Sequence, residues 1–158
     1  SLSFVESAPA INSTYTLDDI QTWETLNNDT AKIMMGTGVY TTTVNMTKDE
    51  AKAKWAINLG DVRESARVYV NDNFVGCAWS VPFILDCKDA FKAGKNTLRI
   101  EVTNLPANRI SEMDRQGVKW RKFDEINVVD INYKKTSYAN WEAVKSGLNS
   151  SVTLLKLK

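Results

Sequence analysis

The side chains that could do acid–base chemistry in this sequence are mainly carboxylates, because the chain contains no histidine. Two carboxylates can together cleave a glycosidic bond at a separation of roughly 5–5.5 Å or 6.5–9.5 Å. With 19 Asp and Glu residues, accidental pairs are easy to propose, and a solvated helix face with strand ends is the favoured interpretation. We therefore predict no catalytic residue; the acids considered are Glu112 with Asp114, Asp124 with Glu125, and Asp130.

A second set of side chains suits sugar recognition and lies in segment 104–121. An aromatic face packs on the C–H patches of a pyranose, and planar Arg and Asn groups hydrogen-bond its hydroxyls. Two other interpretations stay open: structural ion pairs around a tryptophan that covers one end of the fold, and contact with a neighbouring domain. The candidates for carbohydrate binding or for a domain interface in this segment are Asn108, Arg109, Arg115, Trp120 and Arg121.

The other aromatic residues divide between core and surface. Trp55 falls on the apolar phase of its strand, so we predict it in the core, and we expect Trp23 and Trp141 to close the core edges. Trp79 precedes a Ser-Val-Pro turn, where core or loop-anchor packing is favoured and ligand contact is the alternative. Tyr69 lies on the polar phase of its strand and is a further candidate for stacking on a ligand.

The cysteines and glycines indicate no further chemistry. Cys77 and Cys87 are the only cysteines, and their spacing is not that of a zinc site. Two buried free thiols are favoured, because Cys packs as a small hydrophobe, and a disulfide is the alternative. The glycines of Gly36-Thr-Gly38 lack the rest of a phosphate-binding loop, so we expect no nucleotide site.

The elements that must position these side chains are mostly strands, because apolar residues recur with a period of two between turn signals. We predict strands over 40–44, 51–59, 66–70, 74–76, 83–85, 98–102, 126–133 and 152–157, with a hairpin turn at Asn71-Asp72-Asn73. Short helical turns are predicted from Asp86 or Lys88 to Gly94, from Asn104 or Leu105 to Gln116 with Ile110 and Met113 inward and Gly117 as the stop, and from Asn140 to Gly147.

Length and charge set the class of the protein. The 158 residues, 43% of them hydrophobic, predict one domain over residues 1–158. A net charge of +1 favours no nucleic-acid or anionic-membrane partner, and no apolar stretch approaches the ~20 residues of a membrane span. We predict an all-β antiparallel β-sandwich with a few short helices. Because the chain opens at Ser1 without an initiator Met, we expect part of a larger polypeptide.

An ordered series of motifs resembles a known family. Leu59-Gly60, Val70-Asn71-Asp72, Val75-Gly76, Pro82-Phe83, Asp86 and Gly94-Lys-Asn96-Thr-Leu98 follow the order of the sugar-binding domain of glycoside hydrolase family 2, with Asp72 where that family has Gly. The flanks resemble the C-terminal jelly roll of bacterial family 106 α-L-rhamnosidase-like proteins; they are Trp23, Gly36-Thr-Gly-Val-Tyr40, Val102-Thr-Asn-Leu-Pro-Ala-Asn-Arg-Ile110 and Asn140-Trp-Glu-Ala-Val-Lys-Ser-Gly-Leu148.

This resemblance implies a galactose-binding-domain-like jelly-roll fold, and it implies that catalysis belongs to another domain of the same polypeptide. It implies a periplasmic or secreted location, that catalytic domain as partner, and carbohydrate as a further partner. Folds of this type often carry a structural Ca²⁺, but the candidate ligands Asp61, Glu64 and Asp86 form no dense acidic loop, so we predict no metal or cofactor and keep calcium as the alternative.

The function expected from these observations is that of a non-catalytic accessory domain, near the C-terminal end of a glycoside hydrolase. Two alternatives stay open. One is an autonomous carbohydrate-binding module that uses Trp120 or Trp79, and the other is a small carboxylate-dependent glycosidase.

Overall fold

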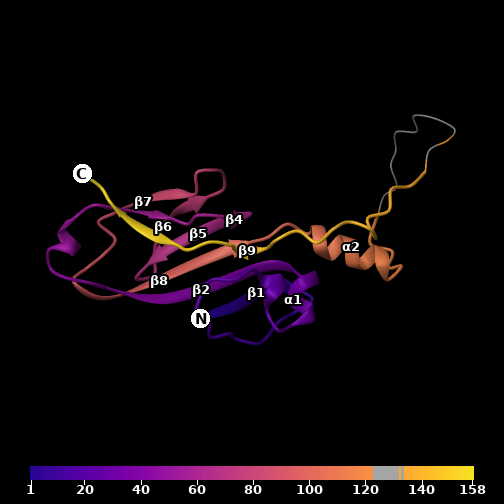
Figure 1. Cartoon of the computed structure of the whole chain (residues 1–158), viewed down its shortest axis with the longest axis horizontal. Helices are drawn as coiled ribbons and strands as arrows, with labels where there is room; N and C mark the ends of the chain where they lie inside the picture. The colour runs from indigo at the N-terminus through magenta and orange to yellow at the C-terminus, as the bar shows by residue number, and fades with distance from the viewer. Residues whose placement is uncertain (123–131, 133) are drawn as a thin grey trace.

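The computed structural model, which describes residues 1–122, 132 and 134–158, is built from antiparallel sheets (Figure 1). The five-stranded sheet has the order β1-β2-β8-β5-β6, the three-stranded sheet has the order β10-β3-β7, and β4 pairs with β9. The strands are β1 Leu2–Ala8, β2 Met35–Met46, β3 Trp55–Asn58, β4 Val62–Arg63, β5 Ser65–Val70, β6 Asn73–Ala78, β7 Ile84–Lys88, β8 Gly94–Thr103, β9 Gly147–Leu148 and β10 Thr153–Lys156. The helices are α1 Asp29–Ile33 and α2 Ala107–Arg115, with 3₁₀ turns η1 Trp23–Thr25 and η2 Glu50–Lys52.

The five-stranded sheet is organised around β2 and β8, which pair from Thr37↔Thr103 to Met46↔Gly94. Alternate residues of β8 point into the core, as the period of two predicts, and Leu98, Ile100 and Val102 are all buried. Directly opposite residues share a face, so Tyr40 lies over the core beside Ile100. The predicted β-sandwich fold is confirmed.

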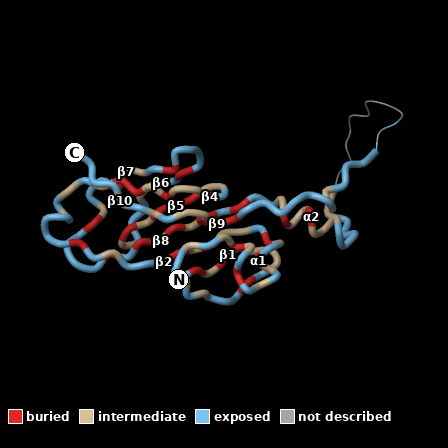
Figure 2. Tube along the Cα trace, viewed as in Figure 1, coloured by how far each residue is buried: buried red, intermediate tan, exposed pale blue. Residues whose placement is uncertain are grey.

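The hairpin of β5 and β6 is confirmed together with its turn. Asn71 and Asp72 adopt φ values of 51° and 63°, the left-handed pair that a two-residue hairpin of this twist requires. Asp tolerates this conformation through its short polar side chain, so Asp72 can replace a glycine here. Figure 2 shows buried segments gathered along β2, β5 and β8, while the chain around and beyond α2 is mostly exposed or intermediate.

The strand predicted over 51–59 is wrong in its first half. Residues 50–52 form η2, because Thr47 and Glu50 cap each other: the Thr47 N–H donates to Glu50 Oε2 at 2.7 Å and the Glu50 N–H donates to Thr47 Oγ1 at 3.2 Å. The predicted alternation also fails at Ala56, which is buried beside buried Ile57, next to a register shift. Trp55 is half-buried against the core rather than inside it.

Two predicted helical turns are absent from the described structure. Between β7 and β8 the chain forms a loop, because the buried Asn96 side chain accepts from Lys92 N and donates to the carbonyls of Lys92 and Gly94. Residues 141–146 form no helix, since the backbone of Val144 bonds to Asn108 and the carbonyl of Ser146 accepts from Trp23 N. In both places other hydrogen bonds, from a nearby side chain in the first and from remote segments in the second, take the place of helical bonds.

The α2 helix is confirmed, with Gly117 at φ 65° just beyond it, but its inward face differs from the prediction. Asn108 and Ser111 are buried, whereas Ile110 and Met113 are only half-buried. In the described residues no helix is long and apolar enough to span a bilayer. The strand predicted over 126–133 and the acids Asp124, Glu125 and Asp130 lie, apart from residue 132, outside the described part of the chain.

The remaining predictions are confirmed in part. The strand over 152–157 is confirmed as β10. Trp23 is fully buried in the core, and Trp141 is half-exposed. Both cysteines are free, as predicted, but Cys77 is exposed and only Cys87 is buried. The outward position of Cys77 on β6, opposite Arg67 of β5, explains its exposure.

Candidate functional site

The candidate site is a group of aromatic rings next to α2, the helix that lies beyond the end of the sandwich in Figure 1. We call Trp120, Arg121, Tyr138 and Trp141 the α2 aromatic cluster. The Tyr138 ring lies between the two indoles, with its centroid 6.1 Å from that of Trp120 and 4.4 Å from that of Trp141. The Arg121 guanidinium carbon lies 5.0 Å from the ring centroids of both Trp120 and Tyr138. The cluster therefore combines apolar ring faces with a planar donor, as sugar recognition requires.

Asp114 of α2 organises this cluster. Its carboxylate accepts from Trp120 Nε1 at 2.6 Å and from the backbone N–H of Tyr138 at 2.7 Å. These two bonds, that from Tyr138 first, hold the pKa of Asp114 below its ordinary value of 3.8. A general acid needs a raised pKa, so Asp114 is a positioning residue that ties segment 134–138 to the helix.

The neighbouring acid is also engaged within the helix. Glu112 accepts from Arg115 Nε at 2.9 Å and from Gln116 Nε2 at 2.6 Å. Glu112 and Asp114 thus behave as the structural pair favoured from the sequence rather than as an acid and a base. Arg115 also reaches the Ala139 carbonyl at 3.4 Å, which adds a second tie between α2 and the segment after it.

Asn108 and Arg109 have contrasting surroundings on α2. The Asn108 carboxamide is buried, donates to the Val144 carbonyl at 2.8 Å and accepts from the Val144 N–H at 2.9 Å. Both bonds are made within the chain, so Asn108 holds segment 141–146 and has little left for a ligand. Arg109 is half-buried and forms no ion pair with any described residue.

A hollow of about 270 Å³ adjoins the cluster. It is smaller than the roughly 300–1,000 Å³ of most small-molecule sites, so the cluster is a platform more than a pocket. Arg121 lines this hollow and donates a hydrogen bond to the Thr136 carbonyl at 2.6 Å. The lining residues are Asp114, Val118, Lys119, Trp120, Arg121, Lys135, Thr136 and Ser137.

Tyr69 and Trp79 lie on the sandwich, away from the α2 aromatic cluster. The Arg99 guanidinium lies 3.8 Å from the Tyr69 ring centroid, and Phe74 packs at 5.4 Å, so one face of Tyr69 is occupied. Trp79, in the loop between β6 and β7, is 76% exposed, which rules out the favoured core position. The structure therefore brings together only the candidates on or beside α2.

Sequence reasoning missed Tyr138, which occupies the middle of the cluster. Tyr138 lies three residues before Trp141, and this spacing is visible in the sequence. Only the contact of Tyr138 with Trp120 in the tertiary structure shows that these rings form one cluster.

Two of the three calcium candidates, Asp61 and Asp86, make other contacts. Asp61 accepts from Arg63 Nε at 2.7 Å, and Asp86 accepts from the Lys88 N–H at 2.8 Å. Among the described residues no group of three or more His, Cys, Asp or Glu side chains could hold a metal ion.

Comparison with known proteins gives a family match and large relatives. The family model described as "Glycosyl hydrolase 2 galactose-binding domain-like" matches residues 19–146. A putative beta-glucuronidase from Formosa agariphila is 29% identical over 155 residues, which cover 87% of this chain and 13% of that protein. The chain thus spans a small fraction of its curated relative.

Solved structures share the fold. A rhamnosidase from Novosphingobium sp. PP1Y superposes with a TM-score of 0.67 and 26% identity, over 87% of this chain and 12% of that one. An FMN-binding beta-glucuronidase from Facaelibacterium prausnitzii L2-6 superposes with a TM-score of 0.55 and 20% identity, over 97% of this chain and 20% of that one. At 20% identity, the similarity to this beta-glucuronidase bears on the fold alone.

Proposed function

The chain belongs to the glycosyl hydrolase 2 galactose-binding domain-like family, and from this membership we propose that it is a non-catalytic accessory domain of a rhamnosidase-like glycoside hydrolase. The proposal is supported by the small share, 13% and 12%, of the relatives that the chain spans. A position near the C-terminal end of the parent and a periplasmic or secreted location are parts of this proposal. Sequencing of the parent gene and cell fractionation test them.

The engaged carboxylates support a non-catalytic role. Glycoside hydrolysis needs one carboxyl group with a raised pKa to protonate the leaving oxygen. Asp114 has a lowered pKa instead, and Glu112 is bound to Arg115 and Gln116. Hydrolysis of plant glycans by this chain alone, measured against the active parent, would favour the small glycosidase instead.

The single observation that carries the proposal is the exposed apolar loop between β6 and β7. Trp79 is 76% exposed and Val81 is 81% exposed, and Ile84 at the start of β7 is 40% exposed. Large apolar side chains that project from one loop are typical of a surface buried in a complex or against another domain. We therefore assign this loop to contact with the catalytic domain of the same polypeptide.

Amide hydrogen exchange tests this contact. We expect residues 79–84 to exchange more slowly in the full-length parent than in the isolated chain, because a docked domain excludes water from the loop. Equal exchange in both proteins would refute the contact.

Matched variants separate docking from folding. Trp79→Ala should leave the stability of the isolated chain within about 0.5 kcal/mol, since its side chain is largely exposed. In the full-length parent the same change should lower the unfolding temperature of this domain, whereas Trp141→Ala should not.

A second candidate function, an autonomous carbohydrate-binding module, is favoured by the α2 aromatic cluster. The tilted rings of Trp120, Tyr138 and Trp141 offer apolar faces to a sugar, and the planar Arg121 guanidinium lies beside two of them. Calorimetric titration with rhamnose- and galactose-containing oligosaccharides tests this function. Binding that Trp141→Ala abolishes and Trp79→Ala leaves intact would establish it, and no binding by folded protein at millimolar ligand would exclude it.

A further inference from the structure

A second hollow, unrelated to the predicted site residues, lies on the inner face of the large sheet. It has a volume of about 600 Å³, within the roughly 300–1,000 Å³ of small-molecule sites. Its floor is formed by β2 and β8, and its walls by segment 148–154 and by the loop 17–20. We call this hollow the β2 groove. It is lined by Ser1, Leu17, Asp18, Asp19, Ile20, Tyr40, Thr41, Thr42, Thr43, Val44, Leu98, Ile100, Leu148, Ser151, Val152 and Leu154.

The groove exists because the small sheet leaves part of the large one uncovered. Tyr40, Thr42 and Val44 alternate along β2 and share the inner face with Ile100, Leu98 and Asn96 of β8. Tyr40 is buried, but Thr42 is exposed and Val44 is half-buried. An inward-facing residue of a central strand is normally covered, so an exposed Thr42 marks an open site.

The lining has the two-sided chemistry of a saccharide site. Val44 and Leu154, both half-buried, provide apolar side chains for the C–H face of a sugar ring, above the buried Leu98 and Ile100. Asp18 and Asp19 on one wall are acceptors for sugar hydroxyls, and Thr42 adds a hydroxyl from the floor.

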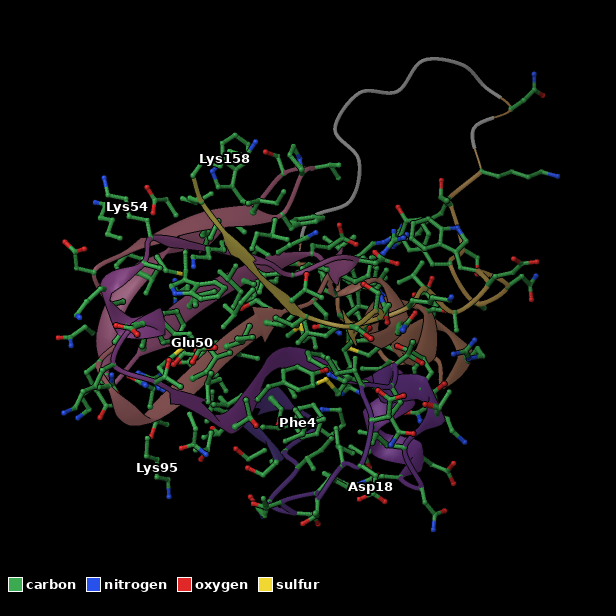
Figure 3. The ribbon with its side chains drawn as sticks, turned by 60° about the vertical axis from the view of Figure 1, so that its left-hand side comes forward. Phe4, Asp18, Glu50, Lys54, Lys95 and Lys158 are labelled. Atoms are coloured by element: carbon green, nitrogen blue, oxygen red, sulfur yellow. The ribbon has the colours of Figure 1, made fainter. Side chains whose placement is uncertain are left out.

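The charge of the lining selects among saccharides. The lining residues include two carboxylates and no Lys or Arg, and their one positive group, the Ser1 ammonium, donates to the Thr41 carbonyl at 2.8 Å. Lys54, Lys95 and Lys158 project from the outer surface (Figure 3), and none of them lines the groove. Like charges repel, so a uronate or a sulfated sugar is disfavoured against a neutral one.

Tyr40 adds an unused donor at the inner wall of the groove. Its hydroxyl accepts from Trp23 Nε1 at 2.8 Å and from the Leu148 N–H at 3.1 Å, and no described residue accepts its own proton. Burial raises the pKa of Tyr40 above its ordinary value of 10.0, so the proton stays on the oxygen at neutral pH. Since Tyr40 and Leu148 both line the groove, this donor lies beside the space that a ligand would fill.

From these features we propose that the β2 groove binds a neutral saccharide, with its C–H face on Val44 and Leu154 and its hydroxyls at Asp18, Asp19 and Thr42. The proposal rests on the glycoside hydrolase context of the proposed function. It is independent of the α2 aromatic cluster and of the loop that carries Trp79.

Titration of the whole chain with L-rhamnose, D-galactose, cellobiose and D-glucuronate tests the proposal. We expect at least one neutral sugar to bind and D-glucuronate to bind at least about tenfold more weakly, if at all. Thr42→Trp should abolish binding, because the indole would occupy the groove. Thr97→Trp is the matched control, since Thr97 is exposed on the neighbouring strand β8 and does not line the groove.

The outcomes are separable. Loss of binding in Thr42→Trp with retention in both Thr97→Trp and Trp141→Ala supports the groove. No binding by the folded chain, preferential binding of D-glucuronate, unchanged binding in Thr42→Trp, or loss only in Trp141→Ala would each overturn it. The accessory-domain proposal fails separately, through unchanged hydrogen exchange at residues 79–84 in the full-length parent.

Discussion

The indole nitrogen of Trp23 donates a hydrogen bond to the hydroxyl of Tyr40 at 2.8 Å, inside the core. The same hydroxyl accepts from the backbone N–H of Leu148, so one oxygen joins η1, β2 and β9, which are far apart in the sequence. A buried polar group that satisfies two others is costly to remove. This bond therefore fixes how the terminal segments close on the sandwich.

Tyr40→Phe should destabilise the chain by roughly 2–6 kcal/mol, because each of the two buried donors it orphans costs about 1–3 kcal/mol. Urea unfolding followed by tryptophan fluorescence measures the loss. Tyr69→Phe is the control, since the Tyr69 ring is half-buried and packs against Arg99 and Phe74. Similar losses in the two variants would contradict the role given to the Tyr40 hydroxyl.

Gly147→Ala should cost more than Gly117→Ala. Both glycines have positive φ, 89° and 65°, so each substitution carries about 1–2 kcal/mol of backbone strain. A Cβ at Gly147 would also collide with Trp23 Nε1 and the Tyr40 hydroxyl, whereas one at Gly117 meets nothing within 4 Å. We expect a total loss of roughly 2–5 kcal/mol for Gly147→Ala in denaturant unfolding. Equal losses in the two variants would contradict this prediction, because they would show that Trp23 and Tyr40 move away from the new Cβ without cost.

The two thiols should react at different rates with a disulfide reagent at pH 8. Cys77 is exposed and should react at once, while Cys87 is buried. Burial, with a smaller effect from the Asp86 charge, raises the pKa of Cys87 to about 11, so little of its reactive thiolate is present. Cys77→Ser should therefore show no fast phase until the chain is unfolded. A fast reaction in that variant would place Cys87 in contact with solvent.

The link between α2 and segment 134–138 should loosen only in acid. The pKa of Asp114 is lower in the folded chain than in the unfolded one, so its contribution is fully present above about pH 4 and is lost as the pH falls through the folded pKa. The amide resonance of Tyr138 should titrate with a midpoint below 3.8. Asp114→Asn should remove this titration, and Glu142→Gln should not. A midpoint above 3.8 would contradict the assigned bonds.

The fold could be predicted where one strand face is buried and the other is wet. Leu98, Ile100 and Val102 alternate with polar residues, and the hairpin turn at Asn71-Asp72 has its own local signal. The helix that ends before Gly117 could also be predicted, because a glycine that stops a helix is a local signal. These features depend on neighbours in the sequence.

The errors arose where a side chain binds the backbone groups that a helix would use. Asn96 holds the carbonyls of Lys92 and Gly94, and Asn108 holds both polar groups of Val144, so neither segment forms the helix that its own residues favour. The mutual cap of Thr47 and Glu50 was visible in the sequence and was overridden in the prediction by the apolar alternation after it.

The sequence by itself determined the class of fold and the family, because the strand period and the order of turn motifs are properties of neighbouring residues. Only the tertiary structure decided which candidates meet. It placed Trp120, Tyr138 and Trp141 together, exposed Trp79, and opened a groove over Thr42. Exposure and cavities depend on how two sheets cover each other, and sheet coverage is a property of the whole fold that no local pattern records.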